Sequence, residues 1–172
     1  MEKEVKMKKY KIGYTTGVFD LFHIGHLNIL KNAKEQCDYL IVGVSTDEVV
    51  KSYKHKKPII PYEERAAIVS AIKYVDQVVP QVSMDKMEAW KVYHFEAIFH
   101  GDDWKGSSLY DDVEARLKNV GCDMVFLPHT DGTSSTLLTE VLQKFRDSEG
   151  KNYTPFNPKK QRDGSIVRRN DL

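Results

Sequence analysis

Two histidines three residues apart, His23 and His26, are the side chains best suited to chemistry in this 172-residue chain. They close the segment GVFDLFHIGH, residues 17–26, which lies between a predicted strand and a predicted helix. The two imidazoles would then lie beside the unpaired N–H groups of a helix N-terminus, where anions bind. Gly25 would let a phosphate approach the backbone closely. Polar helix capping is the alternative, but the preceding GVFD segment and the placement between strand and helix favour an anion site.

The segments around this motif alternate between strand and helix. Strands are predicted at residues 10–16, 39–44, 77–80, 97–100 and 124–127. Helices are predicted at residues 26–36, 61–72, 84–94 and 110–119, with a last one from Ser134 or Ser135 to about Arg146. Residues 46–57, polar and lysine-rich, are predicted to form a loop. The alternation predicts an α/β fold, a single domain with a Rossmann-like, doubly wound sheet of about five parallel strands. Ligands bind at the carboxyl ends of such strands, where both histidines fall.

Composition limits the classes of partner. The net charge is +1, so no general affinity for nucleic acid is expected. No apolar run is long enough to span a membrane, and the first residues lack the apolar core of a signal peptide. We therefore expect a cytoplasmic protein with no membrane insertion. Residues 8–146 should form the folded domain. Residues 147–172 are polar and basic, which predicts a solvated C-terminal tail or an arm on a partner subunit or substrate.

The chain has two cysteines, Cys37 and Cys122. Two buried thiols are favoured over a disulfide. Neither cysteine has a second Cys or His at the spacing of zinc ligands, so no metal site built from protein side chains is predicted.

The segment GVFDLFHIGH resembles the signature of the cytidylyltransferase group within the HxGH nucleotidyltransferase superfamily. Further segments follow in that family's order and spacing: STDE at 45–48, YEER at 62–65, YVD at 74–76, GDDW at 101–104 and HTDGTSST at 129–136. The resemblance covers roughly residues 9–142 and is greatest to bacterial glycerol-3-phosphate cytidylyltransferases. It marks residues 8–146 as a nucleotidyltransferase domain.

The resemblance implies in-line attack of an acceptor phosphate oxygen on the α-phosphorus of CTP, with release of pyrophosphate. Catalysis would then consist mainly of positioning and charge stabilisation. Mg²⁺ is the implied cofactor, held largely by phosphate and water. The implied partners are CTP and a phosphorylated small alcohol, with glycerol 3-phosphate favoured, and a second copy of the chain in a homodimer. The alternatives are another acceptor (phosphocholine, phosphoethanolamine or a phosphonate), ATP as donor, or a nucleotide-binding protein of low activity.

Carried over residue by residue, the resemblance assigns roles to the motif positions. The catalytic residues would be His23, His26, Lys54 and Lys56. The nucleotide-binding residues would be Thr16, Gly17, Val18, Phe19, Gly25, Arg65, Gly101, Asp102, Asp103, His129, Thr130, Gly132, Ser134, Ser135 and Thr136. The acceptor-binding residues would be Asp20, Lys54, Lys73 and Trp104. Simpler readings remain open: a solvated charge run at residues 54–57, a surface arginine at 65, and capping by Ser134 or Ser135.

Two positions depart from the family pattern. His129 and Lys73 stand where relatives commonly have arginine, whose planar, permanently charged group binds phosphate with two parallel hydrogen bonds. An imidazole loses its charge in the neutral pH range. If the His129 imidazolium replaces that arginine, activity should fall as the pH rises, and His129→Arg should flatten the profile. Acceptor identity and triphosphate affinity therefore stay open.

Overall fold

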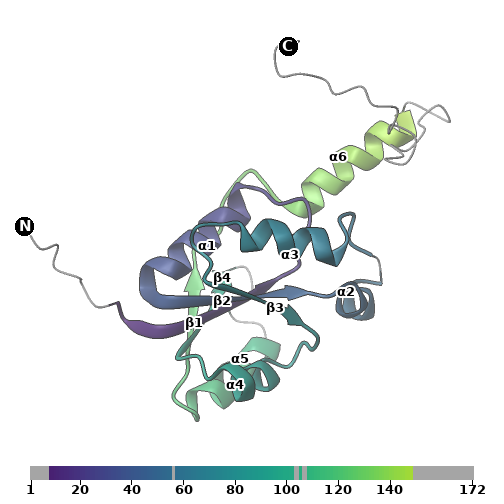
Figure 1. Ribbon diagram of the computed structural model, residues 1–172. Coiled ribbons are helices and arrows are strands. Elements are labelled where there is room, and N and C mark those ends of the chain that lie inside the picture. Colours follow the sequence, from purple (N-terminus) through teal and green to yellow (C-terminus); the bar gives the residue numbers. More distant parts are fainter. Residues whose placement is uncertain (1–7, 56, 103–104, 106–107, 149–172) are drawn as a thin grey trace, which may run out of the picture. The chain divides into compact units, whose positions relative to one another are not determined.

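The computed structural model describes residues 8–55, 57–102, 105 and 108–148. Within these residues the chain forms a parallel five-stranded sheet in the order β3-β2-β1-β4-β5 (Figure 1). The strands are β1 (Tyr10–Gly17), β2 (Cys37–Ser45), β3 (Gln77–Gln81), β4 (Ala97–Gly101) and β5 (Asp123–Leu127). The predicted Rossmann-like α/β fold is confirmed.

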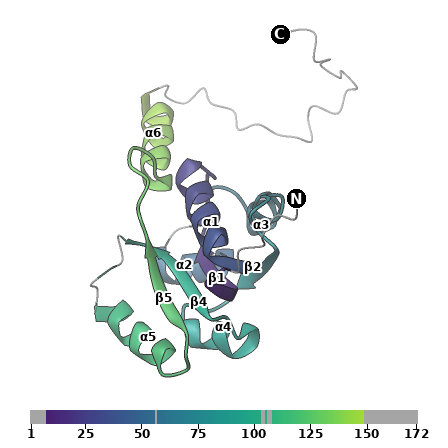
Figure 2. The ribbon, with the colours of Figure 1, turned by 90° about the vertical axis from the view of Figure 1, so that its left-hand side faces the viewer.

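Helices cover both faces of the sheet (Figures 1 and 2). One face carries α1 (Ile24–Gln36) and α3 (Tyr62–Ser70), and the other carries α4 (Lys86–Tyr93) and α5 (Ser108–Lys118). The direction of strand order reverses between β1 and β4, because β1 leads through α1 to β2 whereas β4 leads through α5 to β5 on its other side. Doubly wound sheets bind ligands at such a switch point.

The last helix, α6 (Ser135–Ser148), crosses a boundary between two compact units, residues 1–138 and 139–172. The sheet and the helices on its faces belong to the first unit. The predicted boundary between domain and tail, at residues 146 and 147, stays a prediction, and residues 149–172 of that tail lie outside the described residues. Among the described helices, none combines the length and apolar character needed to cross a membrane.

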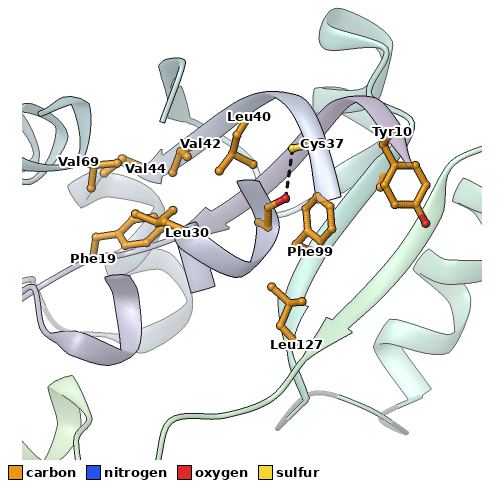
Figure 3. Close-up of a cluster of buried hydrophobic side chains, with 12 residues drawn as sticks. Tyr10, Phe19, Leu30, Cys37, Leu40, Val42, Val44, Val69, Phe99 and Leu127 are labelled. Atoms are coloured by element: carbon orange, nitrogen blue, oxygen red, sulfur yellow. Dashed lines mark hydrogen bonds between the residues drawn. The ribbon is translucent and has the colours of Figure 1, made fainter. Parts of the chain in front are cut away.

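The core on the α1 and α3 side packs Leu30 and Ala33 of α1 against Val42 and Val44 of β2 and Phe99 of β4 (Figure 3). These five side chains have almost no exposed surface. Burial of strand residues on both faces explains the nearly continuous apolar run of β2. The core fixes β1 between β2 and β4, and therefore fixes the position of the loop that follows β1.

Cys37 and Cys122 are buried free thiols. The Cys37 Sγ–H donates to the Ala33 carbonyl at 3.3 Å (Figure 3). Burial raises the pKa of Cys37 to about 11 and that of Cys122 to about 12. Both thiols are therefore protonated at neutral pH and behave as small apolar side chains.

The predicted loop at residues 46–57 is wrong for most of its length, because Asp47–Lys54 forms helix α2. Thr46 caps this helix, with its hydroxyl accepting from the Val49 N–H at 3.3 Å. Asp47 and Glu48 lie in the first turn and Lys51 and Lys54 in the last, so the charges complement the helix dipole. Val49 and Val50 are the buried residues of α2. Two apolar residues among lysines are too few to indicate a helix from the sequence.

Candidate active site

A cavity of about 220 Å³ opens at the carboxyl ends of β1 and β4. Its lining comes from three places: the loop after β1 with the start of α1, the end of β4, and the segment between β5 and α6. The predicted residues that it brings together are Thr16, Gly17, Phe19, His23, Gly25, His26, Gly101, His129, Thr130 and Ser135. The cavity therefore unites the motifs at residues 16–26, 101 and 129–135 into one site.

His23 and His26 form a reciprocal cap at the start of α1. His23 Nδ1 accepts from the Gly25 N–H at 3.1 Å, and His26 Nδ1 accepts from the His23 N–H at 3.3 Å. The two rings stack, with centroids 3.9 Å apart. Because each Nδ1 is an acceptor, the proton of each neutral ring resides on Nε2. The cap thus selects the tautomer in which both histidines are Nε2–H donors at the cavity.

Burial also keeps these rings uncharged. Burial is the largest of three causes, with the charges of His23 and Lys54, that together lower the pKa of His26 to about 3. Burial lowers the pKa of His23 as well, followed by the charge of His129. The influence of Lys54 on His26 shows that the last turn of α2 lies near the histidine pair. The pair therefore offers neutral hydrogen-bond donors across the neutral pH range.

Gly25 makes room for the His23 ring. A Cβ on Gly25 would lie 2.8 Å from His23 Cε1 and 2.9 Å from His23 Nδ1. Any side chain at position 25 would displace the imidazole that caps the helix. The sequence suggested that a glycine here lets phosphate approach the backbone. The structure shows a further reason for glycine, which is the space that the His23 ring occupies.

The side-chain carboxylate and the backbone carbonyl of Asp20 both accept hydrogen bonds that hold the loop after β1. The Asp20 carboxylate accepts from the Ile59 and Ile60 N–H groups at 2.8 and 2.9 Å. The Asp20 carbonyl accepts from Ser135 Oγ at 2.7 Å, and Ser135 Oγ lies 3.4 Å from His23 Nε2. Because the Ser135 hydroxyl donates its proton to the Asp20 carbonyl, its oxygen acts as the acceptor of the His23 Nε2–H. This arrangement agrees with the tautomer set by the cap.

Phe19 and Leu21 flank Asp20 with φ angles of 54° and 49°. Left-handed backbone at residues other than glycine is uncommon and costs energy, and it concentrates at functional sites. Phe19 is 4% exposed, and its ring centroid lies 5.3 Å from that of the His26 ring. The hydrogen bonds of Asp20 and the packing of Phe19 therefore hold the strained loop in the conformation that places the histidines at the cavity.

Arg65 is fully buried, although the sequence suggested either a phosphate contact or a surface position. Its Nε donates to the Ile60 carbonyl at 2.8 Å, Nη1 donates to the Val18 carbonyl, and Nη2 pairs with Asp47 at 2.5 Å. One guanidinium thus joins the loop after β1, the segment before α3 and the start of α2. A contact between Arg65 and phosphate stays a prediction. In the structure the guanidinium nitrogens donate to acceptors of the protein itself.

The segment between β5 and α6 is tied to the rest of the cavity. Thr130 Oγ1 accepts from Asn28 Nδ2 of α1 at 3.0 Å, and Asp102 Oδ1 accepts from the His129 N–H at 3.1 Å. Ser134 caps α6, with Oγ accepting from the Leu137 N–H at 3.1 Å. The capping predicted for Ser134 or Ser135 is therefore confirmed for Ser134.

Several predicted residues do not line the cavity. Lys73 precedes β3, at the opposite end of the sheet from the cavity, with Nζ over the Tyr74 ring. Lys54 ends α2, with Nζ 5.7 Å from the centre of the Tyr53 ring. The others are Val18, Asp20, Arg65, Asp102, Gly132, Ser134 and Thr136. The predicted roles of Lys56, Asp103 and Trp104 fall outside the described residues.

Four lining residues were given no role from the sequence: Thr15, Ile29, His100 and Thr133, the last of which lies within the motif at residues 129–136. His100 carried a usable signal, because it ends the predicted strand at residues 97–100, and side chains at the carboxyl ends of parallel strands face the ligand crevice.

The buried histidines should make the fold sensitive to acid. The pKa values of His26 and His100 are lowered to about 3, below the ordinary 6.5. As the pH falls from 6.5 toward 3, the unfolded chain takes up protons that the folded chain does not. Each histidine then removes at most about 1.4 kcal/mol of unfolding free energy per pH unit.

Urea denaturation should therefore give an unfolding free energy roughly 2–4 kcal/mol lower at pH 5 than at pH 7. In His100→Gln the decrease should be about half as large. Equal stability of the wild type at the two pH values would contradict the assignment of neutral, buried histidines.

Comparison with known proteins agrees with the geometry. Residues 14–141 match the Cytidylyltransferase-like family. The chain is 39% identical over 129 residues to glycerol-3-phosphate cytidylyltransferase of Bacillus subtilis, covering 74% of this chain and 94% of that protein. It is 32% identical over 142 residues to FAD synthase of Thermococcus kodakarensis, covering 82% and 95%. A solved structure, the lipopolysaccharide core biosynthesis protein from Thermoplasma volcanium, matches with a TM-score of 0.61 at 26% identity, over 72% of this chain and 99% of that chain.

Proposed function

Because the chain belongs to the cytidylyltransferase-like family and is a nucleotidyltransferase, we propose that it transfers CMP from CTP to a phosphorylated small alcohol, with glycerol 3-phosphate favoured. An oxygen of the acceptor phosphate attacks the α-phosphorus, a P–O bond forms to the acceptor, and the bond to pyrophosphate breaks. The acceptor phosphate is already an anion, so the step needs no general base. The catalytic task is to align the reactants and stabilise negative charge.

The observation that carries this proposal is the pair of Nε2–H donors at the start of α1. His23 and His26 are held as neutral donors by backbone N–H groups at their Nδ1 atoms. Donors fixed before the ligand arrives stabilise developing charge without reorganising during the reaction. The Thr130 hydroxyl, which accepts from Asn28, lines the same cavity and can donate its own proton to a phosphate oxygen. Lys54, whose charge reaches His26, would supply the nearby cation.

Mg²⁺ is part of the proposal as a companion of the triphosphate. The cavity lining offers imidazoles and hydroxyls but no carboxylate among the described residues. Such a donor set suits a metal that keeps water and phosphate ligands, because Mg²⁺ prefers oxygen donors and dehydrates reluctantly. When bound, it would neutralise charge on the leaving pyrophosphate.

The alternative donor is ATP, and the relative named FAD synthase supports it, since FAD contains AMP joined to a flavin phosphate. Glycerol 3-phosphate remains favoured because the relative named for it is the more similar of the two, 39% against 32% identical. Phosphocholine, phosphoethanolamine and phosphonates are the other acceptors to test.

The test is pyrophosphate release with each of four nucleoside triphosphates against a panel of acceptors, with Mg²⁺ and with EDTA. The panel contains glycerol 3-phosphate, phosphocholine, phosphoethanolamine, a phosphonate and FMN. Release that requires CTP, glycerol 3-phosphate and Mg²⁺ supports the proposal. Release with ATP alone would replace the donor, and no release with any pair would leave a nucleotide-binding protein of low activity.

His129→Arg is expected to tighten CTP binding several-fold, because a planar, permanently charged guanidinium can bind a phosphate with two parallel hydrogen bonds. Steady-state kinetics with CTP provide the measurement, with Lys73→Arg, at the far end of the sheet, as the matched control. An unchanged KM for CTP would show that position 129 does not contact the triphosphate.

A homodimer and a cytoplasmic location complete the proposal. Light scattering of the purified chain tests the first, with a mass near twice 19.8 kDa expected. Neither nucleic acid nor a membrane is needed as a partner in this reaction.

A further inference from the structure

His100 is a buried residue with an unmatched polar atom at the edge of the cavity. It lies near the end of β4, on the same face of the sheet as Ile98, and its side chain is 6% exposed. Within the part of the chain that the structure describes, His100 Nε2 is buried and has no hydrogen-bond partner. The Tyr110 ring meets the imidazole edge-on at 5.0 Å. A polar atom buried without a partner costs about 1–3 kcal/mol, so it asks for an explanation.

A buried cation stands beside this histidine. Lys86, the first residue of α4, is 5% exposed, and its Nζ donates to Thr16 Oγ1 at 3.1 Å. No ion pair among the described residues involves Lys86. Burial, together with the charge of Lys86, lowers the pKa of His100 to about 3, so the ring is neutral.

The Lys86 ammonium also fixes the role of Thr16. An ammonium group only donates, so Thr16 Oγ1 accepts from it and the hydroxyl proton of Thr16 must be given elsewhere. Thr16 and His100 both line the cavity. Together they present a hydroxyl donor and a neutral imidazole nitrogen to whatever fills it.

The ligand group that satisfies both is a hydroxyl. It can accept the Thr16 proton and at the same time donate to a bare Nε2, and it can also accept from Nε2 in the other tautomer. A ligand ammonium would meet the charge of Lys86 at close range in a poorly hydrated site, which disfavours it. The torsion that turns an imidazole about Cβ–Cγ is soft, so Nε2 can swing toward a bound ligand.

We propose that His100 is a specificity-determining residue whose Nε2 hydrogen bonds to a sugar or polyol hydroxyl of a bound substrate, with Thr16, positioned by Lys86, as its partner. The proposal rests on the proposed function, because a nucleotide ribose or a polyol phosphate acceptor must occupy the cavity. The hydroxyl belongs either to the ribose or to the acceptor, and paired ligands distinguish these sources.

The test compares wild type, His100→Leu and His100→Gln on ligands with and without hydroxyls. CTP is paired with 2′-deoxy-CTP and 3′-deoxy-CTP, and glycerol 3-phosphate with propyl phosphate. His100→Leu should raise KM roughly 3- to 10-fold for the ligand that carries the contacted hydroxyl and leave its deoxy analogue unaffected. His100→Gln, which places an amide near the position of Nε2, should recover part of the loss. The ligand pair that shows this difference identifies the source.

Equal losses on every ligand, or no loss on any, would overturn the proposal and leave His100 a structural residue. Melting temperatures of both variants separate such a structural defect from a lost contact. If the wild type turns over no substrate pair, the proposed function fails. Calorimetric titration of the same variants with the same ligand pairs then decides the role of His100 by the same comparison.

Discussion

His26→Asn is expected to lower kcat for CMP transfer by about 10²- to 10³-fold, the usual cost of removing one donor that stabilises a developing oxyanion. In the wild type His26 Nδ1 accepts from the His23 N–H at 3.3 Å. In the variant the asparagine Oδ1 can take the place of this Nδ1. The helix cap would therefore persist while the Nε2–H at the cavity is lost. Single-turnover measurements of CDP-alcohol formation, with melting temperatures alongside, test both parts.

His26→Gln is the matched control, because its amide nitrogen can reach the position of Nε2 but its side chain cannot cap in the same way. We expect it to retain more activity than His26→Asn despite a lower melting temperature. The reverse order would mean that capping of α1, and not the donor at the cavity, is what His26 contributes.

Arg65→Ala is expected to lower the unfolding free energy by about 3 kcal/mol or more, because it leaves several acceptors without their partner. The guanidinium now serves Asp47 and the carbonyls of Val18 and Ile60, and none of its surface is exposed. In a protein of this size such a loss lowers Tm by about 6–12 °C. Calorimetry or thermal denaturation followed by circular dichroism measures it.

Asp47→Asn is the control for this prediction. It keeps an oxygen near Nη2 and removes only the charge, so its effect should be smaller, about 1 kcal/mol. Arg65→Lys keeps a charge but loses the forked geometry and should fall between the two. If Arg65→Ala melts like wild type yet binds CTP far more weakly, the guanidinium acts on the phosphates and not on the fold.

The course of the chain could be read from the sequence because apolar runs mark its most buried strands and helical patterns separate most of the strands. Cys37–Ser45 and Ala97–Gly101 are buried along most of their length, and such runs stand out without any tertiary information. The position of the histidine pair followed from that reading, since the carboxyl ends of parallel strands are where ligands bind.

The remaining features depend on partners that are distant in sequence. The burial of Arg65 requires acceptors from residues 18, 47 and 60, and the motif around it gives no sign of them. The tautomers of His23 and His26 follow from hydrogen bonds that backbone N–H groups donate to the Nδ1 atoms only once α1 begins at Ile24. Helix α2 carries two buried valines, too few to reveal its period.

The reversal of strand order between β1 and β4 has a consequence for how new substrate preferences arise. The crevice at this point exists because neighbouring strands lead their connections to opposite sides, so the backbone keeps it open whichever side chains line it. Substitutions in the lining can accumulate without the collapse that follows when a cavity in a packed core is altered. Families built on this sheet can therefore diverge in substrate, as the names of two relatives show, while inheriting the same scaffold.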